Sequence, residues 1–129
     1  MGNPVTWFEV YAKDGPKAQR FYAELFDWKV DTNYPMGYGI VEPERGGIRG
    51  GVGHANDMIP VKGVTFYVQV DDLHAYLERA EKLGGKTVLK PFPIPGGPTI
   101  AVFTDLDGNA IGLMTPDPRF VEPSGGLRS

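Results

Sequence analysis

The stretch that decides the fold is Val-Thr-Trp-Phe-Glu-Val-Tyr-Ala at residues 5–12, followed at once by Asp14-Gly15-Pro16. The first segment is rich in β-branched and aromatic residues, which is typical of a strand. The aspartate can cap a helix, and the proline suits the first helical turn. The apolar residues that then share one helical face are Ala18, Phe21, Tyr22 and Leu25. Their spacing predicts a helix from about Gly15 to Phe26.

The same order of elements then occurs a second time. Short strands are predicted at 28–31, 37–42 and 48–53, separated by Gly/Pro turns. A second strand-plus-helix unit starts at 63–70, where Asp71 or Asp72 can cap a helix, so the register is open by one residue. Its apolar stripe is Leu73, Leu77 and Ala80. The strands predicted after it are 86–89, 99–104 and 109–114. The repeat period is about 57 residues.

Two βαβββ repeats predict an α+β fold in one domain over residues 1–129. Repeat one covers 5–53, the linker 54–62, repeat two 63–114 and the tail 115–129. The tail contains three prolines and two glycines, which is typical of an extended segment, and one possibility is that it is disordered. The alternative is that Phe120 and Val121 dock on a neighbouring surface, because both side chains are apolar.

Composition excludes several classes of site. The 129 residues contain no cysteine, which excludes disulfides, thiolate zinc sites, iron–sulfur clusters and a cysteine nucleophile. Two histidines make a multi-histidine metal site hard to build. Lys and Arg are scattered and the net charge is −3, so a nucleic-acid partner is not expected. There is neither an apolar run of about 18 residues nor a signal-peptide pattern, so we expect no membrane contact and a cytoplasmic location.

Several short motifs appear in the order found in a known family. They are Trp7-Phe8-Glu9-Val10, Phe21-Tyr22, Leu25-Phe26-Asp27-Trp28, Leu83-Gly84-Gly85-Lys86 and Phe103-Thr104-Asp105-Leu106-Asp107-Gly108-Asn109. With the two repeats, the chain resembles the vicinal oxygen chelate superfamily, which includes glyoxalase I, bleomycin resistance proteins, extradiol dioxygenases and methylmalonyl-CoA epimerase. The resemblance implies two half-barrels around a cleft, with the helices outside. It also implies a homodimer and, for the enzymes of the family, a divalent metal in the cleft.

The resemblance also implies where metal ligands would stand. These positions fall on Trp7, Gly51, Thr65 and Gly112. Tryptophan and glycine offer no side-chain oxygen, and a lone threonine hydroxyl is a weak ligand. We therefore expect no metal site of the family type and no cofactor. The alternative is a divalent metal held by displaced ligands.

Side chains alternate across a strand, and this assigns the candidate ligand-binding residues to the cleft. They are Trp7, Glu9, Tyr11, Arg49, Thr65, Tyr67 and Met114, with Tyr38 as a further candidate. Glu9 is the candidate catalytic residue, as a base, or a ligand contact. Arg49 suits an anionic or planar group. A structural ion pair is the alternative for both, and core or dimer packing is the alternative for the aromatic residues.

These residues lead to one function and two alternatives. The chain is expected to be a metal-free, small-molecule-binding member of the family, with a planar or aromatic ligand in the cleft. The first alternative is a glyoxalase-like lyase, isomerase or dioxygenase that uses a divalent metal with displaced ligands. The second is an accessory module whose cleft is filled, without a ligand.

Overall fold

The computed structural model describes residues 2–55 and 58–120, and the order of its elements matches the two predicted repeats. The elements of repeat one are β1 (Val5–Ala12), α1 (Gly15–Phe26), β2 (Val30–Asp31), η1 (Pro35–Gly37), β3 (Gly39–Val41) and β4 (Arg49–His54). Those of repeat two are β5 (Val64–Gln69), α2 (Leu73–Lys82), β6 (Lys86–Pro93), β7 (Thr99–Thr104) and β8 (Ala110–Met114). A 3₁₀ turn, η2 (Pro118–Phe120), follows β8.

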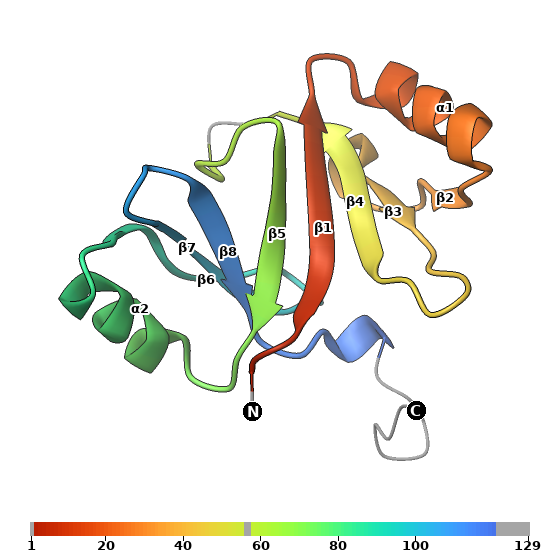
Figure 1. Ribbon diagram of the computed structural model, residues 1–129. Helices are drawn as coiled ribbons and strands as arrows, with labels where there is room; N and C mark the ends of the chain where they lie inside the picture. Colours follow the sequence, from red (N-terminus) through yellow and green to blue (C-terminus); the bar gives the residue numbers. More distant parts are fainter. Residues whose placement is uncertain (1, 56–57, 121–129) are drawn as a thin grey trace.

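The strands form one eight-stranded sheet in the order β2-β3-β4-β1-β5-β8-β7-β6. In each repeat the first strand pairs in parallel with the fourth: β1 with β4 and β5 with β8. The two first strands pair antiparallel at the centre and so join the repeats (Figure 1). The predicted α+β fold with two βαβββ repeats is confirmed.

Both helices begin where a capping aspartate was predicted. The Asp14 side chain accepts a hydrogen bond from the Lys17 amide at 3.1 Å, and α1 has the predicted bounds. Asp72, and not Asp71, caps α2, and its side chain accepts from the Ala75 amide at 3.0 Å. Within residues 2–55 and 58–120, no helix is long and apolar enough to cross a bilayer.

The predicted end of one strand and the predicted inner face of one helix were wrong. β6 continues to Pro93 rather than ending at Leu89, since an edge strand tolerates prolines. On α1, Phe21 and Leu25 are each 59% exposed, although both were placed on the apolar stripe. The side of α1 that faces the sheet carries Gln19, whose amide nitrogen donates to two backbone carbonyls there at 2.8 Å each. Satisfying these buried carbonyls orients the helix.

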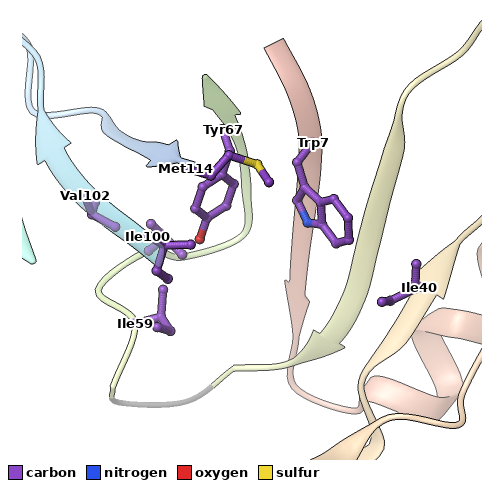
Figure 2. Packing of buried hydrophobic residues seen from close by; sticks show 8 residues of the cluster. Trp7, Ile40, Ile59, Tyr67, Ile100, Val102 and Met114 are labelled. Carbon is purple, nitrogen blue, oxygen red and sulfur yellow. The ribbon is translucent and has the colours of Figure 1, made fainter. Parts of the chain in front are cut away.

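The opposite face of the sheet holds a core to which both repeats and the linker contribute. Its buried members are Trp7, Ile40, Ile59, Val61, Tyr67, Ile100, Val102 and Met114. Figure 2 shows Trp7 of β1, Tyr67 of β5 and Met114 of β8 together in this interior. The glycines at the centre of this face, Gly51 and Gly112, leave no open space, because the aromatic side chains of Tyr38 and Tyr67 fill it.

The segment after β8 crosses back over this face. Thr115 is tied to Thr99 by two hydrogen bonds of 3.0 Å, one through its backbone amide and one through its hydroxyl. The Phe120 ring then lies 6.2 Å from the ring of Trp7. Phe120 therefore docks on its own chain, whereas Val121 and the rest of the tail lie outside the described residues.

Candidate functional site

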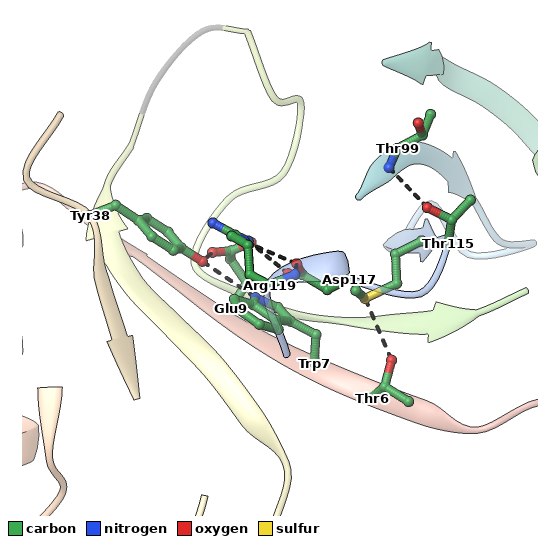
Figure 3. A network of polar contacts seen from close by, with 9 residues as sticks. Thr6, Trp7, Glu9, Tyr38, Thr99, Thr115, Asp117 and Arg119 are labelled. Atoms are coloured by element: carbon green, nitrogen blue, oxygen red, sulfur yellow. Dashed lines mark hydrogen bonds and ion pairs between the residues drawn. The ribbon is translucent and has the colours of Figure 1, made fainter. Parts of the chain in front are cut away.

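Glu9 is a buried carboxyl group at the centre of the concave face, which is the face of the sheet that carries the core around Trp7, Tyr67 and Met114. It projects from the central strand β1 and is only 4% exposed. The Tyr38 hydroxyl donates a hydrogen bond to the Glu9 carboxylate, and the Trp7 indole Nε1 donates to the Tyr38 oxygen at 3.3 Å (Figure 3). Tyr11 and Tyr67 also lie close enough to Glu9 to influence its pKa. The carboxyl is thus surrounded by aromatic residues that carry donors.

This environment changes how Glu9 titrates. Burial raises the pKa of Glu9 from 4.5 to about 7, since a charge is costly away from water. Hydrogen bonds from Tyr38, Tyr11, Tyr67 and Trp7 favour the carboxylate and lower the pKa, but burial outweighs them. Near neutral pH the carboxyl is therefore divided between its two protonation states, so it can either accept or donate a proton.

The tyrosines remain protonated donors at any ordinary pH. Burial, together with the negative charge of Glu9, raises the pKa of Tyr11, Tyr38 and Tyr67 well above the usual value of 10. A phenol that is not ionised keeps its O–H to donate. The site therefore offers one group that exchanges protons and several that only position it.

Two glycines make room for these tyrosine rings. Gly51 pairs with Glu9 across β1 and β4, and Gly112 pairs with Tyr67 across β5 and β8. A Cβ at Gly51 would overlap the Tyr38 hydroxyl, and one at Gly112 would overlap the Tyr67 ring. The two repeats are therefore alike at these positions, because in each of them a glycine lies beneath an aromatic ring.

The residues present do not fit the divalent metal that the resemblance implies. Two of the four positions, Gly51 and Gly112, have no side chain and are covered by rings. Trp7 offers no lone pair, and the Thr65 hydroxyl donates to the Ala110 carbonyl at 2.7 Å. Among the described residues, no group of three or more His, Cys, Asp or Glu side chains could hold a metal ion.

Arg49 lies at the edge of this face and does not pair with Glu9. Its guanidinium forms an ion pair with Glu42 at 2.8 Å and lies 3.9 Å from the centre of the Phe120 ring. Its Nε is buried and has no hydrogen-bond partner. The planar group that Arg49 contacts is therefore a side chain of the same molecule, and one donor of the guanidinium stays unsatisfied.

The structure brings most of the predicted site residues together. Trp7, Glu9, Tyr11, Tyr67 and Met114 share the concave face. Thr65 is engaged with the backbone of β8, as described above. Ligand binding and catalysis by these residues stay predictions.

Two features of the site were underestimated or missed in the sequence. Tyr38 was only a further candidate, although it is the direct partner of Glu9. The room for its ring comes from Gly51 and Gly53 of β4, because an added Cβ at either position would overlap Tyr38. The turn at Asp117 was missed. There the Asp117 carboxylate accepts from the Arg119 amide at 3.0 Å and from its guanidinium at 3.0 and 2.7 Å (Figure 3).

A groove runs along β5 and β8, and Thr65 and the linker residues Ile59 and Val61 are among its lining residues. It has a volume of about 1190 Å³, and its walls include Val64, Phe66 and Val68 of β5 and Ile111 of β8. These walls are mainly apolar and hold no buried charge comparable to that of Glu9. The buried, titrating carboxyl of Glu9 and its tyrosine neighbours therefore favour the concave face over this groove as the candidate site.

Comparisons with known proteins agree with this architecture. The family model described as the Glyoxalase/Bleomycin resistance protein/Dioxygenase superfamily matches residues 5–113. A "Glyoxylase-like domain-containing protein" of Didymella fabae is 30% identical over 123 residues, which cover 86% of this chain and 92% of that protein. The "Putative glyoxylase CFP32" of Mycobacterium bovis is 28% identical over 121 residues, or 88% of this chain. The chain spans 45% of the length of this mycobacterial relative.

A solved structure shows the same fold at low sequence identity. The methylmalonyl-CoA epimerase of Mycobacterium tuberculosis superimposes with a TM-score of 0.64 and 16% identity, covering 89% of each chain. At this identity the similarity concerns the fold alone.

Proposed function

The chain belongs to the glyoxalase/bleomycin resistance protein/dioxygenase superfamily, and we propose that it binds a planar aromatic small molecule on its concave face without a metal. The observation that carries this proposal is that aromatic rings occupy the positions where the family holds metal ligands. Gly51 and Gly112 are covered by the rings of Tyr38 and Tyr67, and Trp7 is a third ring at the site. Aromatic rings bind flat ligands through their faces.

The polar groups of the site define the ligand further. Glu9 titrates near neutral pH, so it accepts a hydrogen bond as carboxylate and donates one as carboxylic acid. Arg49 supplies a flat cation at the edge of the same face. A ring that carries one polar or acidic substituent is the ligand class that uses both groups. A few polar contacts within an apolar lining are the usual composition of a small-molecule site.

Calorimetric titration with 1-naphthoate, a planar aromatic anion, tests the proposal. The chain has two tryptophans, so Trp7→Phe is matched by Trp28→Phe on the outer face, where Trp28 packs against Phe8 and Tyr22. We expect saturable binding by the wild type and by Trp28→Phe, at least about tenfold weaker binding by Trp7→Phe, and no effect of a chelator. Loss of binding after chelation, or equal affinities of the two variants, would contradict the proposal.

A second candidate function is supported by the titration of Glu9. A carboxyl group with a pKa of about 7 suits a general base, because its pKa lies near the working pH. Names among the similar proteins include a putative glyoxylase and a methylmalonyl-CoA epimerase. The corresponding proposal is a lyase or isomerase in which Glu9 removes a proton from carbon next to a carbonyl group.

Exchange of hydrogen for deuterium tests this second candidate. A panel of carbonyl compounds with an acidic C–H bond is incubated with the protein in D₂O and followed by proton NMR. Wild type and Glu24→Gln, which changes an exposed carboxylate of α1, are expected to exchange the proton, and Glu9→Gln is not. Elemental analysis of the same samples tests the metal alternative, and one bound divalent ion per chain would favour it. The homodimer and the cytoplasmic location stay predictions.

A further inference from the structure

The ring of Phe120 lies against the Arg49 guanidinium and near the ring of Trp7. The space that it fills between these residues, the Phe120 slot, has the cation and the aromatic ring expected of a site for a planar ligand. The Arg49 guanidinium lies 3.9 Å from the ring centre, close enough for a cation–π contact. The ring of Trp7 lies 6.2 Å away and is tilted by 41°. These are the two residues through which an external planar ligand would be held. In this chain they hold a side chain of its own C-terminal segment, residues 115–120.

This segment is stabilised within itself and is attached to both repeats. The carboxylate of Asp117 accepts two hydrogen bonds from the Arg119 guanidinium, which fixes the turn that carries Phe120. Thr115 holds the start of the segment to repeat two, as described above. The Arg119 guanidinium lies 5.7 Å from the Tyr34 ring of repeat one, and a Cβ at Gly97 of repeat two would lie 3.2 Å from it. The segment therefore spans the concave face.

Phe120 fills the slot but leaves one hydrogen-bond donor of Arg49 without an acceptor. The Arg49 guanidinium is held in place by Glu42, yet its buried Nε has no partner. A phenyl ring offers no hydrogen-bond acceptor in its plane, so this donor pays a desolvation cost. An aromatic ring that carries an acceptor oxygen would satisfy both the cationic face and the donor.

We propose that the segment 115–120 is a built-in competitor of the ligand, and that an aryl carboxylate binds by displacing the Phe120 ring from Trp7 and Arg49. This inference rests on the proposed function and names the ligand class and the regulation of that site. Only molecules in which the Phe120 ring is displaced can accept the ligand. The measured affinity is therefore the intrinsic affinity multiplied by the fraction of molecules in which the ring is displaced. β8 ends at Met114, before the segment begins, so the ring moves without loss of strand pairing.

The first experiment uses no ligand. In a Trp28→Phe background Trp7 is the remaining tryptophan, and its fluorescence reports on its surroundings. We expect Phe120→Ala to shift the emission of Trp7 to longer wavelength and to raise its quenching by acrylamide. Phe21→Ala is the matched control, because Phe21 is an exposed phenylalanine on α1. It is expected to leave both readings unchanged, and a Trp7 signal unaffected by Phe120→Ala would overturn the inference.

The second experiment measures competition with 1-naphthoate by calorimetry. Phe120→Ala is expected to bind at least about tenfold more tightly than the wild type, and Phe21→Ala is expected to bind like the wild type. Asp117→Asn keeps the ring but weakens the turn, so it is expected to bind more tightly than the wild type by a smaller factor. It also decides the question if Phe120→Ala does not fold. Circular dichroism establishes which variants are folded.

The outcomes separate the two claims. Equal binding of 1-naphthoate by wild type, Phe120→Ala and Asp117→Asn would overturn the competitor inference and leave the proposed function standing. Binding by none of the folded variants would overturn the proposed function itself. Tighter binding by the two segment variants, but not by the control, supports both.

Discussion

Replacing Glu9 with glutamine should remove most of the pH dependence of stability between pH 5 and 8. The Glu9 carboxyl has an ordinary pKa of 4.5 in the unfolded chain and a pKa of about 7 in the folded protein, where burial disfavours the charge. Between these values the folded state binds more protons than the unfolded state. Stability therefore falls as the pH rises through this range, and the whole penalty is present above pH 7.

The size of the effect follows from the two pKa values. At about 1.4 kcal/mol for each unit of pKa, the change from 4.5 to about 7 corresponds to about 3 kcal/mol. Roughly 2.5 kcal/mol of this lies between pH 5 and 8. A neutral glutamine keeps an oxygen that accepts from Tyr38 and has no charge to desolvate. The pH-dependent loss of stability therefore disappears in Glu9→Gln.

Urea unfolding of wild type, Glu9→Gln and Glu24→Gln at pH 5 and pH 8 provides the assay. The difference in unfolding free energy between wild type and Glu9→Gln should change by about 2.5 kcal/mol between the two pH values, with Glu9→Gln relatively more stable at pH 8. Because the variants are compared at the same pH, the contributions of the other titrating groups to the unfolding free energy cancel. Glu24→Gln, on the exposed surface of α1, should follow the wild type. A difference that is the same at both pH values would refute the assignment of Glu9 as a buried carboxyl with a raised pKa.

Two further substitutions test the packing and the helix ends. Gly51→Ala places a Cβ on the Tyr38 hydroxyl and should destabilise the fold by about 1–3 kcal/mol, whereas Gly2→Ala, where the added carbon meets nothing, should be neutral in the same unfolding assay. Asp72→Ala removes the cap of α2 and should lower the unfolding free energy by about 1 kcal/mol. Asp71→Ala at the neighbouring position should cost clearly less, and equal losses would contradict the assigned cap.

The repeat and the helix bounds could be predicted from the sequence because their signals are local. Asp14 and the apolar spacing after it were sufficient to define α1 from Gly15 to Phe26, as found. The choice between Asp71 and Asp72 stayed open, since both side chains can accept the same amide hydrogen bonds. The backbone conformation that places Asp72 at the helix start decides it.

The face that α1 presents to the sheet could not be read from its apolar residues. Phe21 and Leu25 remain largely exposed, while Gln19 is buried. The reason lies in residues distant in the sequence, because Gln19 satisfies the carbonyls of Gly37 and Val52. A hydrophobic stripe predicts burial only where no stronger polar requirement competes with it.

For the site, the sequence by itself determined which chemistry is available. The absence of cysteine and the residues Trp7, Gly51, Thr65 and Gly112 already argued against a metal site of the family type, since donor atoms depend on residue identity. Strand alternation placed Trp7, Glu9 and Tyr67 on one face for the same local reason.

Only the tertiary structure decided what surrounds those residues. It placed the Tyr38 hydroxyl on Glu9, the ring of Phe120 against Arg49, and Glu42 as the ion-pair partner of Arg49. Each pair joins residues from different elements, so neither periodicity nor composition encodes its distance. Burial, and with it the raised pKa of Glu9, exists only once both repeats and the C-terminal segment have closed over the same face and excluded water.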